Sequence, residues 1–591
     1  MTGETVPLPA GRFGSDVIAE TLRDCAIPYV ALNPGASFRG LHDSLVNHLG
    51  NRAPEILLCL HEEHAVAIAH GYAKVTGRPM AAAVHSNVGL MHATMAIFNA
   101  WCDRMPVLVL GATGPVDAAQ RRPWIDWIHT SADQGALVRS YVKWDAQPAS
   151  VAAAREAVLR GTVLSRSAPQ GPVYINFDTE TQEGPAPDHP LAEAARFLEI
   201  PSSGASRANL RDAAQRLSQA KRIVILAGRV SRGSAAWQDR IALAEGLGAQ
   251  VITDTKVAAA FPTDHPAYAG DLRGGRGAEA RAALAAADAV LALDWVDLKG
   301  ALDIAAPADT AQVIRVTLDP HSHNGWSMDH QAHPPADLMI GAEPDIFTAD
   351  LLDEMALPRG ESYCAVPLTP PKPDATRIDV ARIASELQAA LGDLPATLTH
   401  VTLSWDGTFW PFREPLDYLG SDGGGGLGAG PGHAIGAALA LRDMGSDRVP
   451  VAICGDGDFL MGVTALWTAV HHRIPLLMVI ANNRSFYNDE VHQEKVARMR
   501  GRDVANKGVG IQMTDPGIAL ADMARAQGCT AFGPVEDAGA LCQTFKDAIA
   551  ITQAGGVAVV EVETAPGYPP ALVSALTTTV QTDQKQAATT G

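Results

Sequence analysis

Apolar runs and helical segments alternate along nearly the whole chain. Runs such as VPVAIC, PLLMVI and VAVVEV have the length and composition of strands that are buried on both faces of a parallel sheet. The segments between such runs, for example HAVAIAHGYAKVTG, read as helices. Strands that alternate with helices are typical of doubly wound parallel sheets with helices on both faces, so the pattern predicts an α/β fold.

Two loose polar stretches divide this pattern into three parts. The linker DTETQEGPAPDHP follows the first part, and PRGESYCAVPLTPPKPDATR follows the second. We therefore predict three doubly wound parallel-sheet domains, at residues 10–185, 200–355 and 376–570. A polar tail at residues 571–591 is expected to be disordered, or else to fold over a site.

Composition and charge narrow the class of protein. The chain has 591 residues and a formal net charge of -19, which argues against nucleic-acid binding through a basic surface. It has no signal-peptide pattern and no apolar run of about 18 residues, so no membrane span is expected. Seven scattered cysteines without a CxxC motif argue against structural zinc and fit a reduced compartment. We expect a cytoplasmic enzyme of small metabolites.

Two polar clusters follow predicted buried strands in the third domain. GDG, with Asp456 at its centre, follows VPVAIC, and NN, which ends at Asn483, follows PLLMVIA. Ligands of parallel sheets bind at such carboxyl ends, where glycines bring backbone N–H groups close to phosphate. A carboxylate beside phosphate needs a divalent cation, and Mg²⁺ would take oxygens from Asp456, Asn483 and the Ser485 carbonyl. The alternative is a tight turn and an ordinary loop.

With this spacing, GDG followed by NN resembles the cofactor motif of thiamine-diphosphate-dependent enzymes. The resemblance extends over nearly the whole chain and includes the glycine-rich segment GGGGLGAGPGHAIGAALALR. It implies that Leu427 lies under the cofactor and holds it bent. Asp458 stands where many relatives have a small residue, and its charge should weaken diphosphate binding unless it points away or pairs with a base. The cofactor-binding residues implied by the resemblance are Ser404, Gly425, Gly426, Leu427, Gly455, Gly457 and Asp458.

The first predicted domain contains LHEEHAVAIAHGYAKVTGRP, which resembles the family's HE…A.GYA..TG segment. The resemblance assigns the cofactor's glutamate to Glu62 and not to its neighbour Glu63. A carboxylic acid at the pyrimidine N1′ favours the imino form at N4′, and that nitrogen then removes the C2 proton. Desolvation in an apolar pocket is expected to keep part of this carboxyl group protonated. The alternative is a solvated glutamate at the start of a helix.

Several segments resemble benzoylformate decarboxylase more than other branches of the family. In AVHSNVG, His85 stands where that enzyme has its active-site histidine, and a neutral imidazole there could relay protons. The alternative is a core histidine bonded to backbone. The family's first-loop serine aligns with Ala36, and Ser37 is next to it. His129, in WIDWIHTSADQG, aligns with an apolar pocket wall and is a second proton-handling candidate.

The predicted substrate pocket is more polar than a phenyl ring requires. Burial of unpaired polar groups is costly, so we expect a donor substrate with hydroxyl, carbonyl or amine groups and not benzoylformate itself. The polar residues of this predicted pocket, apart from the first-loop positions, are Ser421, Asp422, Asn488, Asp489, Glu490 and His492.

The resemblance implies a C–C lyase or carboligase that uses thiamine diphosphate and Mg²⁺. We expect it to decarboxylate a polar 2-oxo acid through an enamine, as a homodimer or homotetramer with active sites between subunits. The enzyme alternatives are an acetolactate-synthase-like carboligase and an enzyme that cleaves a hydroxyketone or 1,2-dione without releasing CO₂. WIDWIHTSADQ replaces the phenylalanine–glutamine–glutamate segment of acetolactate synthase, which also argues against FAD.

Two alternatives of another class remain. A catalytically inactive protein that binds thiamine diphosphate would be expected to lack the glutamate, and Glu62 is present. A nucleotide-binding protein would use GDG for ATP, but the chain has no GxxxxGK[ST] loop.

Overall fold

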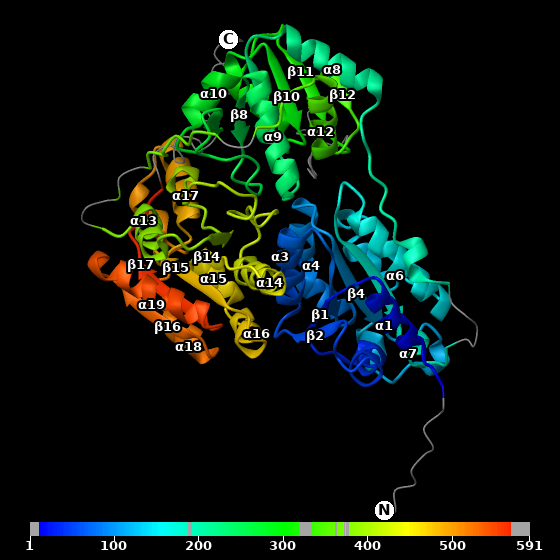
Figure 1. Cartoon of the computed structure of the whole chain (residues 1–591). Coiled ribbons are helices and arrows are strands. Elements are labelled where there is room, and N and C mark those ends of the chain that lie inside the picture. Colours follow the sequence, from blue (N-terminus) through cyan, green and yellow to red (C-terminus); the bar gives the residue numbers. More distant parts are fainter. Residues whose placement is uncertain are drawn as a thin grey trace, which may run out of the picture. The chain divides into compact units, whose positions relative to one another are not determined.

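The computed structural model describes residues 11–186, 192–272, 274–319, 334–360, 363–370, 373 and 377–568 (Figure 1). The predicted tail at residues 571–591 lies outside the described residues. The chain folds into two compact units, Met1–Pro201 and Ser202–Gly591. The first contains one sheet and the second contains two, and every strand pair in the three sheets is parallel. The predicted α/β fold with three parallel sheets is therefore confirmed.

The first unit is built on a six-stranded sheet in the order β2-β1-β3-β4-β6-β5. Its strands are β1 (Tyr29–Leu32), β2 (Glu55–Leu58), β3 (Met80–Val84), β4 (Val107–Thr113), β5 (Asp145–Ala146) and β6 (Val173–Asp178). The helices that matter for the site and the fold are α1 (Gly14–Asp24), α3 (Glu62–Thr76), α4 (Ser86–Cys102), α5 (Ile125–Ile128) and α6 (Val151–Arg166).

Helices α3 and α4 pack closely against each other beside the sheet. Helix α3 begins after His61, whose ring accepts a hydrogen bond from Glu63 N, and it ends at Gly77, where φ is +64°. Glycine adopts this left-handed conformation without steric cost, which makes it a common helix terminator. The tight packing brings Glu62, the first residue of α3, beside Gly89 in the first turn of α4.

The second unit contains two sheets. The six-stranded sheet has the order β12-β11-β10-β7-β8-β9 and the five-stranded sheet the order β13-β14-β15-β17-β16. The strands of the first are β7 (Ile223–Ala227), β8 (Gln250–Thr253), β9 (Tyr268–Asp271), β10 (Ala289–Leu293), β11 (Gln312–Val316) and β12 (Leu338–Ile340). Those of the second are β13 (Ala396–His400), β14 (Val449–Gly455), β15 (Leu476–Asn482), β16 (Thr530–Val535) and β17 (Val557–Glu563).

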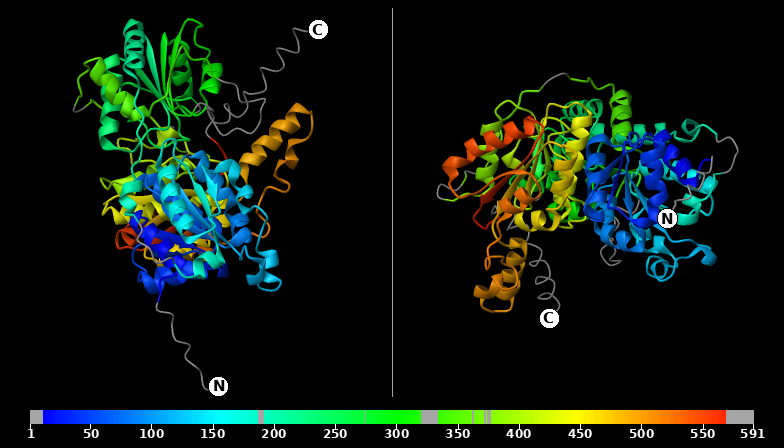
Figure 2. Two further views of the ribbon diagram at one scale, coloured as in Figure 1. Left: turned by 90° about the vertical axis from the view of Figure 1, so that its right-hand side faces the viewer. Right: turned by 90° about the horizontal axis from the view of Figure 1, so that it is seen from below.

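Helices accompany both sheets of this unit. Around the six-stranded sheet they are α8 (Arg207–Gln219), α9 (Ser234–Leu247), α10 (Gly277–Ala285), α11 (Leu298–Ala305) and α12 (Pro344–Glu354). The five-stranded sheet has α13 (Val380–Leu391), α14 (Ala429–Asp443), α15 (Asp456–Gly462), α16 (Ala465–His471), α17 (Tyr487–Met499), α18 (Leu520–Ala526) and α19 (Leu541–Gln553). Figure 2 shows α17, in orange, extending away from the five-stranded sheet.

The two sheets of the second unit share one apolar core, and polar contacts add to the connection. Buried Asp264 accepts hydrogen bonds from Tyr363 Oη at 2.7 Å and from Arg413 Nε at 2.6 Å. Tyr418 Oη donates to the carbonyl of Thr255 at 2.7 Å. A segment before α14 is thus fixed to loops of the six-stranded sheet.

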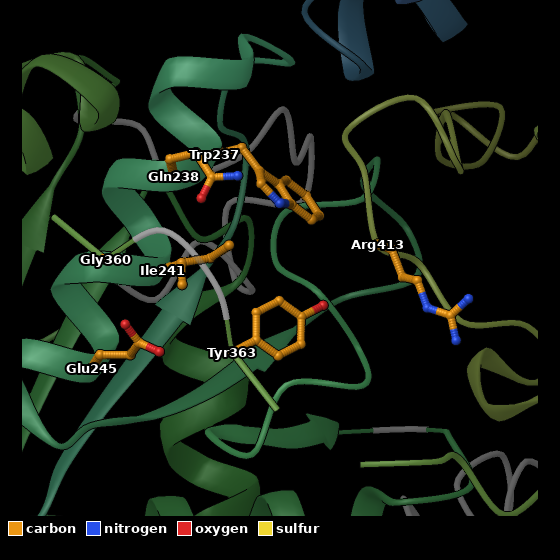
Figure 3. Close-up of a pocket in the computed structure, with 7 residues that line it drawn as sticks. All are labelled: Trp237, Gln238, Ile241, Glu245, Gly360, Tyr363 and Arg413. Atoms are coloured by element: carbon orange, nitrogen blue, oxygen red, sulfur yellow. The ribbon is translucent and has the colours of Figure 1, made fainter. Parts of the chain in front are cut away.

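A cavity of about 240 Å³ lies beside this connection (Figure 3). Trp237, Ile241 and Glu245 line it from one face of α9, and Tyr363 and Arg413 line it from the connecting segments. No predicted site residue lies among its lining residues.

Candidate active site

The predicted metal ligands lie together at the carboxyl ends of two neighbouring strands. β14 ends directly before Asp456, and β15 ends directly before Asn483. The backbone N–H of Ser485 donates to Asp456 Oδ2 at 3.2 Å and to Asn483 Oδ1 at 2.9 Å. Arg484, between the two, has φ +59°, a left-handed conformation that is uncommon for a non-glycine residue. This turn brings Asn483 and Ser485 to the same carboxylate.

The two asparagines of the NN pair have different contacts. Asn482 Nδ2 donates to Glu561 Oε1 at 2.8 Å, and Asn482 Oδ1 accepts from Arg484 N at 3.1 Å. Asn482 therefore fixes the strand end, and Asn483 lines the neighbouring cavity. Asp456 is 4% exposed, and burial raises the pKa of its carboxyl group despite hydrogen bonds from backbone N–H groups.

These residues line a cavity of about 790 Å³ in the second unit. Leu427 contributes an apolar side chain that is 47% exposed. The structure does not place Gly426 or His492 among the lining residues, and His492 is exposed on α17. Glu490 is buried, and it accepts a hydrogen bond from Ser485 Oγ at 2.5 Å. The predicted residues that line the cavity are Ser404, Ser421, Asp422, Gly425, Leu427, Gly455, Asp456, Gly457, Asp458, Asn483, Ser485, Asn488 and Asp489.

Asp458 is paired with a base, which was one of the two arrangements expected to neutralise its charge. Its Oδ1 accepts hydrogen bonds from Gly428 N at 2.7 Å and Gly430 N at 3.3 Å, and its Oδ2 lies 3.1 Å from His400 Nε2. Burial raises the pKa of this carboxyl group. His400 and the two backbone N–H groups lower the pKa by a larger amount, so the net shift is downward. The carboxylate therefore fixes the start of α14.

Several residues that line this cavity were not predicted from the sequence. Thr255 and Lys256 come from the loop after β8 of the six-stranded sheet, a domain in which no site residue was predicted. Both residues follow the carboxyl end of β8, and ligands of parallel sheets bind at such ends. Their position after a predicted strand was therefore a usable signal. His400, the last residue of β13, and Trp405, which follows that strand, were missed in the same way.

The donor set fits Mg²⁺ and a diphosphate. Asp456 and Asn483 offer a carboxylate and an amide oxygen, which are the hard ligands that Mg²⁺ prefers. Asn488 Oδ1 and Trp405 Nε1 are buried, and neither has a hydrogen-bond partner among the residues that the structure describes. Because buried polar atoms are normally paired, two unpaired atoms on residues that line one cavity point to a polar ligand.

In the first unit, Glu62 is the first residue of α3 and faces α4. It is 5% exposed, so the alternative of a solvated glutamate does not hold, whereas Glu63 is only partly buried. Glu62 Oε2 lies 3.0 Å from His92 Nδ1. A Cβ atom on Gly89 would lie 2.9 Å from Glu62 Oε1, so glycine at this position leaves room for the carboxyl group.

The charge state of Glu62 differs from the expected one. Burial raises the pKa of its carboxyl group, but hydrogen bonds from His92 and Asn33 lower it more, and the net shift is downward. Burial alone was expected to keep part of the group protonated. Because a single sequence does not show which donors reach a buried carboxyl group, the hydrogen bonds were not foreseen.

His85, Ser37 and His129 form a cluster beyond the end of β3. Ser37 Oγ lies 2.8 Å from His85 Nδ1 and accepts from Ser86 N at 3.2 Å. The His85 and His129 rings meet edge to face, with centroids 4.8 Å apart. Burial, followed by His129, lowers the pKa of His85, which keeps the imidazole neutral at pH 7. Ala36, beside Ser37, is exposed.

The backbone at this cluster is strained. Ser86 follows His85 and has φ +44°, a left-handed value that favours glycine. The hydrogen bond from Ser86 N to Ser37 Oγ holds this conformation. Non-glycine residues in such conformations are concentrated at functional sites, where the surrounding structure supports them.

Comparison with known proteins assigns all three domains of the chain to one enzyme family. Models of the N-terminal, central and C-terminal domains of thiamine pyrophosphate enzymes match residues 12–137, 210–331 and 402–562, which together make up more than half of the chain. Among the described residues, no helix has the length and apolar character needed to cross a membrane.

The curated relatives include two Pseudomonas aeruginosa proteins. Benzoylformate decarboxylase is 27% identical over 451 residues, which cover 73% of this chain and 79% of that protein. A probable 2-ketoarginine decarboxylase is 28% identical over 526 residues, which cover 84% of each chain. The crystal structure of benzoylformate decarboxylase from Polynucleobacter necessarius has the same fold, with a TM-score of 0.78, 20% identity, and 95% of this chain and 100% of that chain covered. The chain therefore belongs to the thiamine-pyrophosphate-dependent enzyme family.

Proposed function

We propose that the protein is a thiamine-diphosphate- and Mg²⁺-dependent lyase that decarboxylates a polar 2-oxo acid. The observation that carries this proposal is the linked group Asp456, Asn483 and Ser485 at the edge of the 790 Å³ cavity. Family membership supports the cofactor, and the donor set of this group supports the metal.

The roles of the residues follow from their positions. Asp456, Asn483 and the carbonyl of Ser485 would hold the metal, and backbone N–H groups near Gly455 and Gly457 would hold the diphosphate. When bound, thiamine diphosphate supplies a nucleophilic carbon and an electron sink for the electron pair of the broken C–C bond. Glu62 would bind the cofactor's far ring through its carboxyl group.

His85 and His129 are the groups proposed to move protons. A neutral His85 imidazole accepts a proton at one nitrogen while Ser37 Oγ orients the other, and its lowered pKa keeps it available as a base at neutral pH. His129 lies close enough to change the protonation of His85 by its charge.

A polar substrate is proposed because the cavity has polar groups without partners. Asn488 Oδ1 would remain unpaired against a bare phenyl ring, and such a buried atom costs roughly 1–3 kcal/mol. Two curated relatives are decarboxylases whose names specify 2-oxo acids, one with a phenyl group and one with a guanidinium group. The exposed carboxylate of Asp489 favours a substrate that carries a donor or a positive charge.

The test is CO₂ release from a panel of 2-oxo acids, with thiamine diphosphate and Mg²⁺ supplied. The panel pairs benzoylformate with ring-hydroxylated analogues, and straight aliphatic 2-oxo acids with analogues that end in hydroxyl, amine or guanidine. We expect a higher kcat/KM for the polar member of each pair. In the Asn488→Leu variant this preference should decrease.

Three results would overturn the proposal. If no acid releases CO₂ but two carbonyl compounds are joined, the protein is a carboligase. If a hydroxyketone or 1,2-dione is cleaved instead, it is a lyase that does not decarboxylate. If calorimetry shows cofactor binding and no substrate reacts, it is an inactive binding protein. Sedimentation of the loaded protein tests the proposed homodimer or homotetramer.

A further inference from the structure

The carboxyl group of Glu62 has an exposed histidine as its partner. His92 Nδ1 lies 3.0 Å from Glu62 Oε2, and the side chains are 58% and 6% exposed, respectively. The histidine therefore spans the distance from a buried carboxyl group to the surface of this unit. No sequence motif marked His92, because a single histidine within a helix carries no periodic signal.

The ring of His92 is held in place by His61, the residue directly before α3. The His61 and His92 rings are stacked, with centroids 4.8 Å apart and planes 18° apart. His61 is itself fixed, because its Nδ1 accepts a hydrogen bond from Glu63 N at 3.1 Å. A ring that is stacked on one side and bonded through Nδ1 has little rotational freedom, so the Nδ1–Oε2 contact is a defined part of the fold.

Glycine at position 89 completes the arrangement. One turn of α4 separates Gly89 from His92, and a Cβ atom on Gly89 would lie 2.9 Å from Glu62 Oε1. The same helix thus contacts both carboxyl oxygens: His92 bonds Oε2, and Gly89 leaves space at Oε1. Asn33 supplies a further side-chain hydrogen bond to this carboxyl group from outside the helix.

We propose that His92 is a positioning residue for Glu62, one that orients its carboxyl group and exchanges a proton between that group and water at the surface of this unit. The proposal rests on the proposed function, in which Glu62 binds the cofactor. A carboxyl group that changes protonation during a catalytic cycle needs a path for its proton, and Glu62 is almost closed to water. The exposed ring of His92 supplies that path.

The proton balance of the exchange is simple. A proton from water binds the imidazole nitrogen Nε2 and gives an imidazolium, whose Nδ1 proton then moves to Glu62 Oε2. The products are a neutral imidazole with its proton on Nε2 and a carboxylic acid that donates back to Nδ1. The reverse sequence returns the proton to water, and no other reactant is needed.

Other titratable groups near Glu62 favour this route. His61, His64 and His85 all interact electrostatically with Glu62. Burial lowers the pKa of each ring, that of His64 to about 4, and a neighbouring histidine lowers it further; Glu62 raises it, but the net shift is downward for all three. These three rings are poor proton carriers at neutral pH, and His92 alone among the four is hydrogen-bonded to the Glu62 side chain in the described contacts.

The experiment compares two replacements of His92 with a matched control. His92→Leu removes both the donor and the titrating group, whereas His92→Asn keeps a donor nitrogen close to the position of Nδ1 but cannot titrate. The control is His48→Leu, because His48 Nε2 also lies 2.8 Å from a glutamate, Glu20, at an exposed position of the same unit. Circular dichroism and thermal unfolding check that each variant is folded.

The first readout is the number of protons taken up when thiamine diphosphate binds, with Mg²⁺ present. Calorimetry in buffers of different ionisation enthalpy gives this number without turnover. The wild type and His48→Leu should take up the same number, with an upper limit of about one per site. In His92→Leu the pKa of Glu62 rises, because burial is no longer opposed by His92, so proton uptake should decrease most at mildly acidic pH.

The second readout separates orientation from proton exchange. We expect His92→Leu to lower kcat by about tenfold to a hundredfold, the effect of one hydrogen bond to a charged group. The His92→Asn variant should bind the cofactor with the affinity of the wild type, but its kcat should remain below that of the wild type. A lower kcat for His92→Asn that external imidazole restores would support the exchange role.

The outcomes distinguish this proposal from the proposed function. If the wild type does not bind thiamine diphosphate, or if Glu62→Gln is fully active, the proposed function fails. If Glu62→Gln is inactive while both His92 variants match the wild type in proton uptake and kcat, the proposed function stands and the role of His92 is overturned. Equal effects of His92→Leu and His48→Leu would also overturn it.

Discussion

Asp458 and His400 form a buried pair at the start of α14, with Oδ2 3.1 Å from Nε2. The other carboxylate oxygen accepts hydrogen bonds from two backbone N–H groups of the glycine-rich segment. A single carboxylate thus connects β13, α15 and the loop before α14. It makes this loop part of the folded framework before any ligand binds.

Asp458→Ala should destabilise the second unit. Removal of the carboxylate leaves the backbone N–H groups of Gly428 and Gly430 without this buried acceptor, which costs roughly 1–3 kcal/mol. Asp522→Ala is the control, because Asp522 forms an exposed pair with Arg525 that is worth less than about 1 kcal/mol. Urea unfolding of each variant and of the wild type gives the two changes in the free energy of unfolding. A cost for Asp458→Ala as small as that of the control would contradict the structural role.

Gly89→Ala should separate stability from activity. Within a helix, alanine in place of glycine usually stabilises by about 0.5–1 kcal/mol. Here the added Cβ would lie 2.9 Å from Glu62 Oε1, so the carboxyl group has to move. We expect thermal stability close to that of the wild type, with kcat lowered by at least about tenfold. Unchanged kcat would show that the position of Glu62 is not critical.

His129→Gln should move the acidic limb of the pH–activity profile. Burial lowers the pKa of His85 first, and the positive charge of a protonated His129 lowers it further. Removal of His129 takes away a lowering influence, so the pKa of His85 rises and a higher pH is needed to keep it neutral. The midpoint of kcat/KM on the acidic side should therefore shift to higher pH. A shift to lower pH, or none, would exclude this coupling.

Asp103 should make the stability of the first unit depend on acidic pH. Although burial raises its pKa, Lys74 Nζ at 2.9 Å and His70 Nε2 at 3.0 Å lower it to about 2. Because the folded-state value lies below the unfolded value of about 3.9, the stabilisation is complete above that pH and is lost as pH falls through about 2. Its size is roughly 2 kcal/mol.

Asp103→Asn tests this linkage. The variant should be less stable than the wild type at neutral pH, and the difference should shrink as the pH falls from about 4 towards 2. Urea unfolding at a series of pH values measures the difference. A constant difference over that range would show that the Asp103 carboxylate is not the titrating group.

The main features of the fold, and the proximity of the three proposed metal ligands, were predictable from the sequence for simple physical reasons. Strands buried on both faces of a sheet are apolar along their whole length, and their parallel pairing brings GDG and NN to one edge. Asp456, Asn483 and Ser485 are consequently linked through backbone contacts that the spacing implied.

Features that depend on tertiary neighbours were not predictable. The direction of the Asp458 side chain is set by His400, and the lowered pKa of Glu62 is set by His92 and Asn33. Each partner lies far away in the sequence and on another element. The participation of Lys256 depends on how the six-stranded sheet packs against the five-stranded one, and no local pattern encodes that packing.

The left-handed backbone at Ser86 places a limit on how the first unit can be made more robust. A glycine there would relieve the backbone strain, because glycine adopts positive φ without steric cost. The same exchange would let the imidazole of His85 drift, because the stiff kink is what holds it against Ser37. Thermal stability and catalytic turnover would then make opposite demands on the residue at position 86.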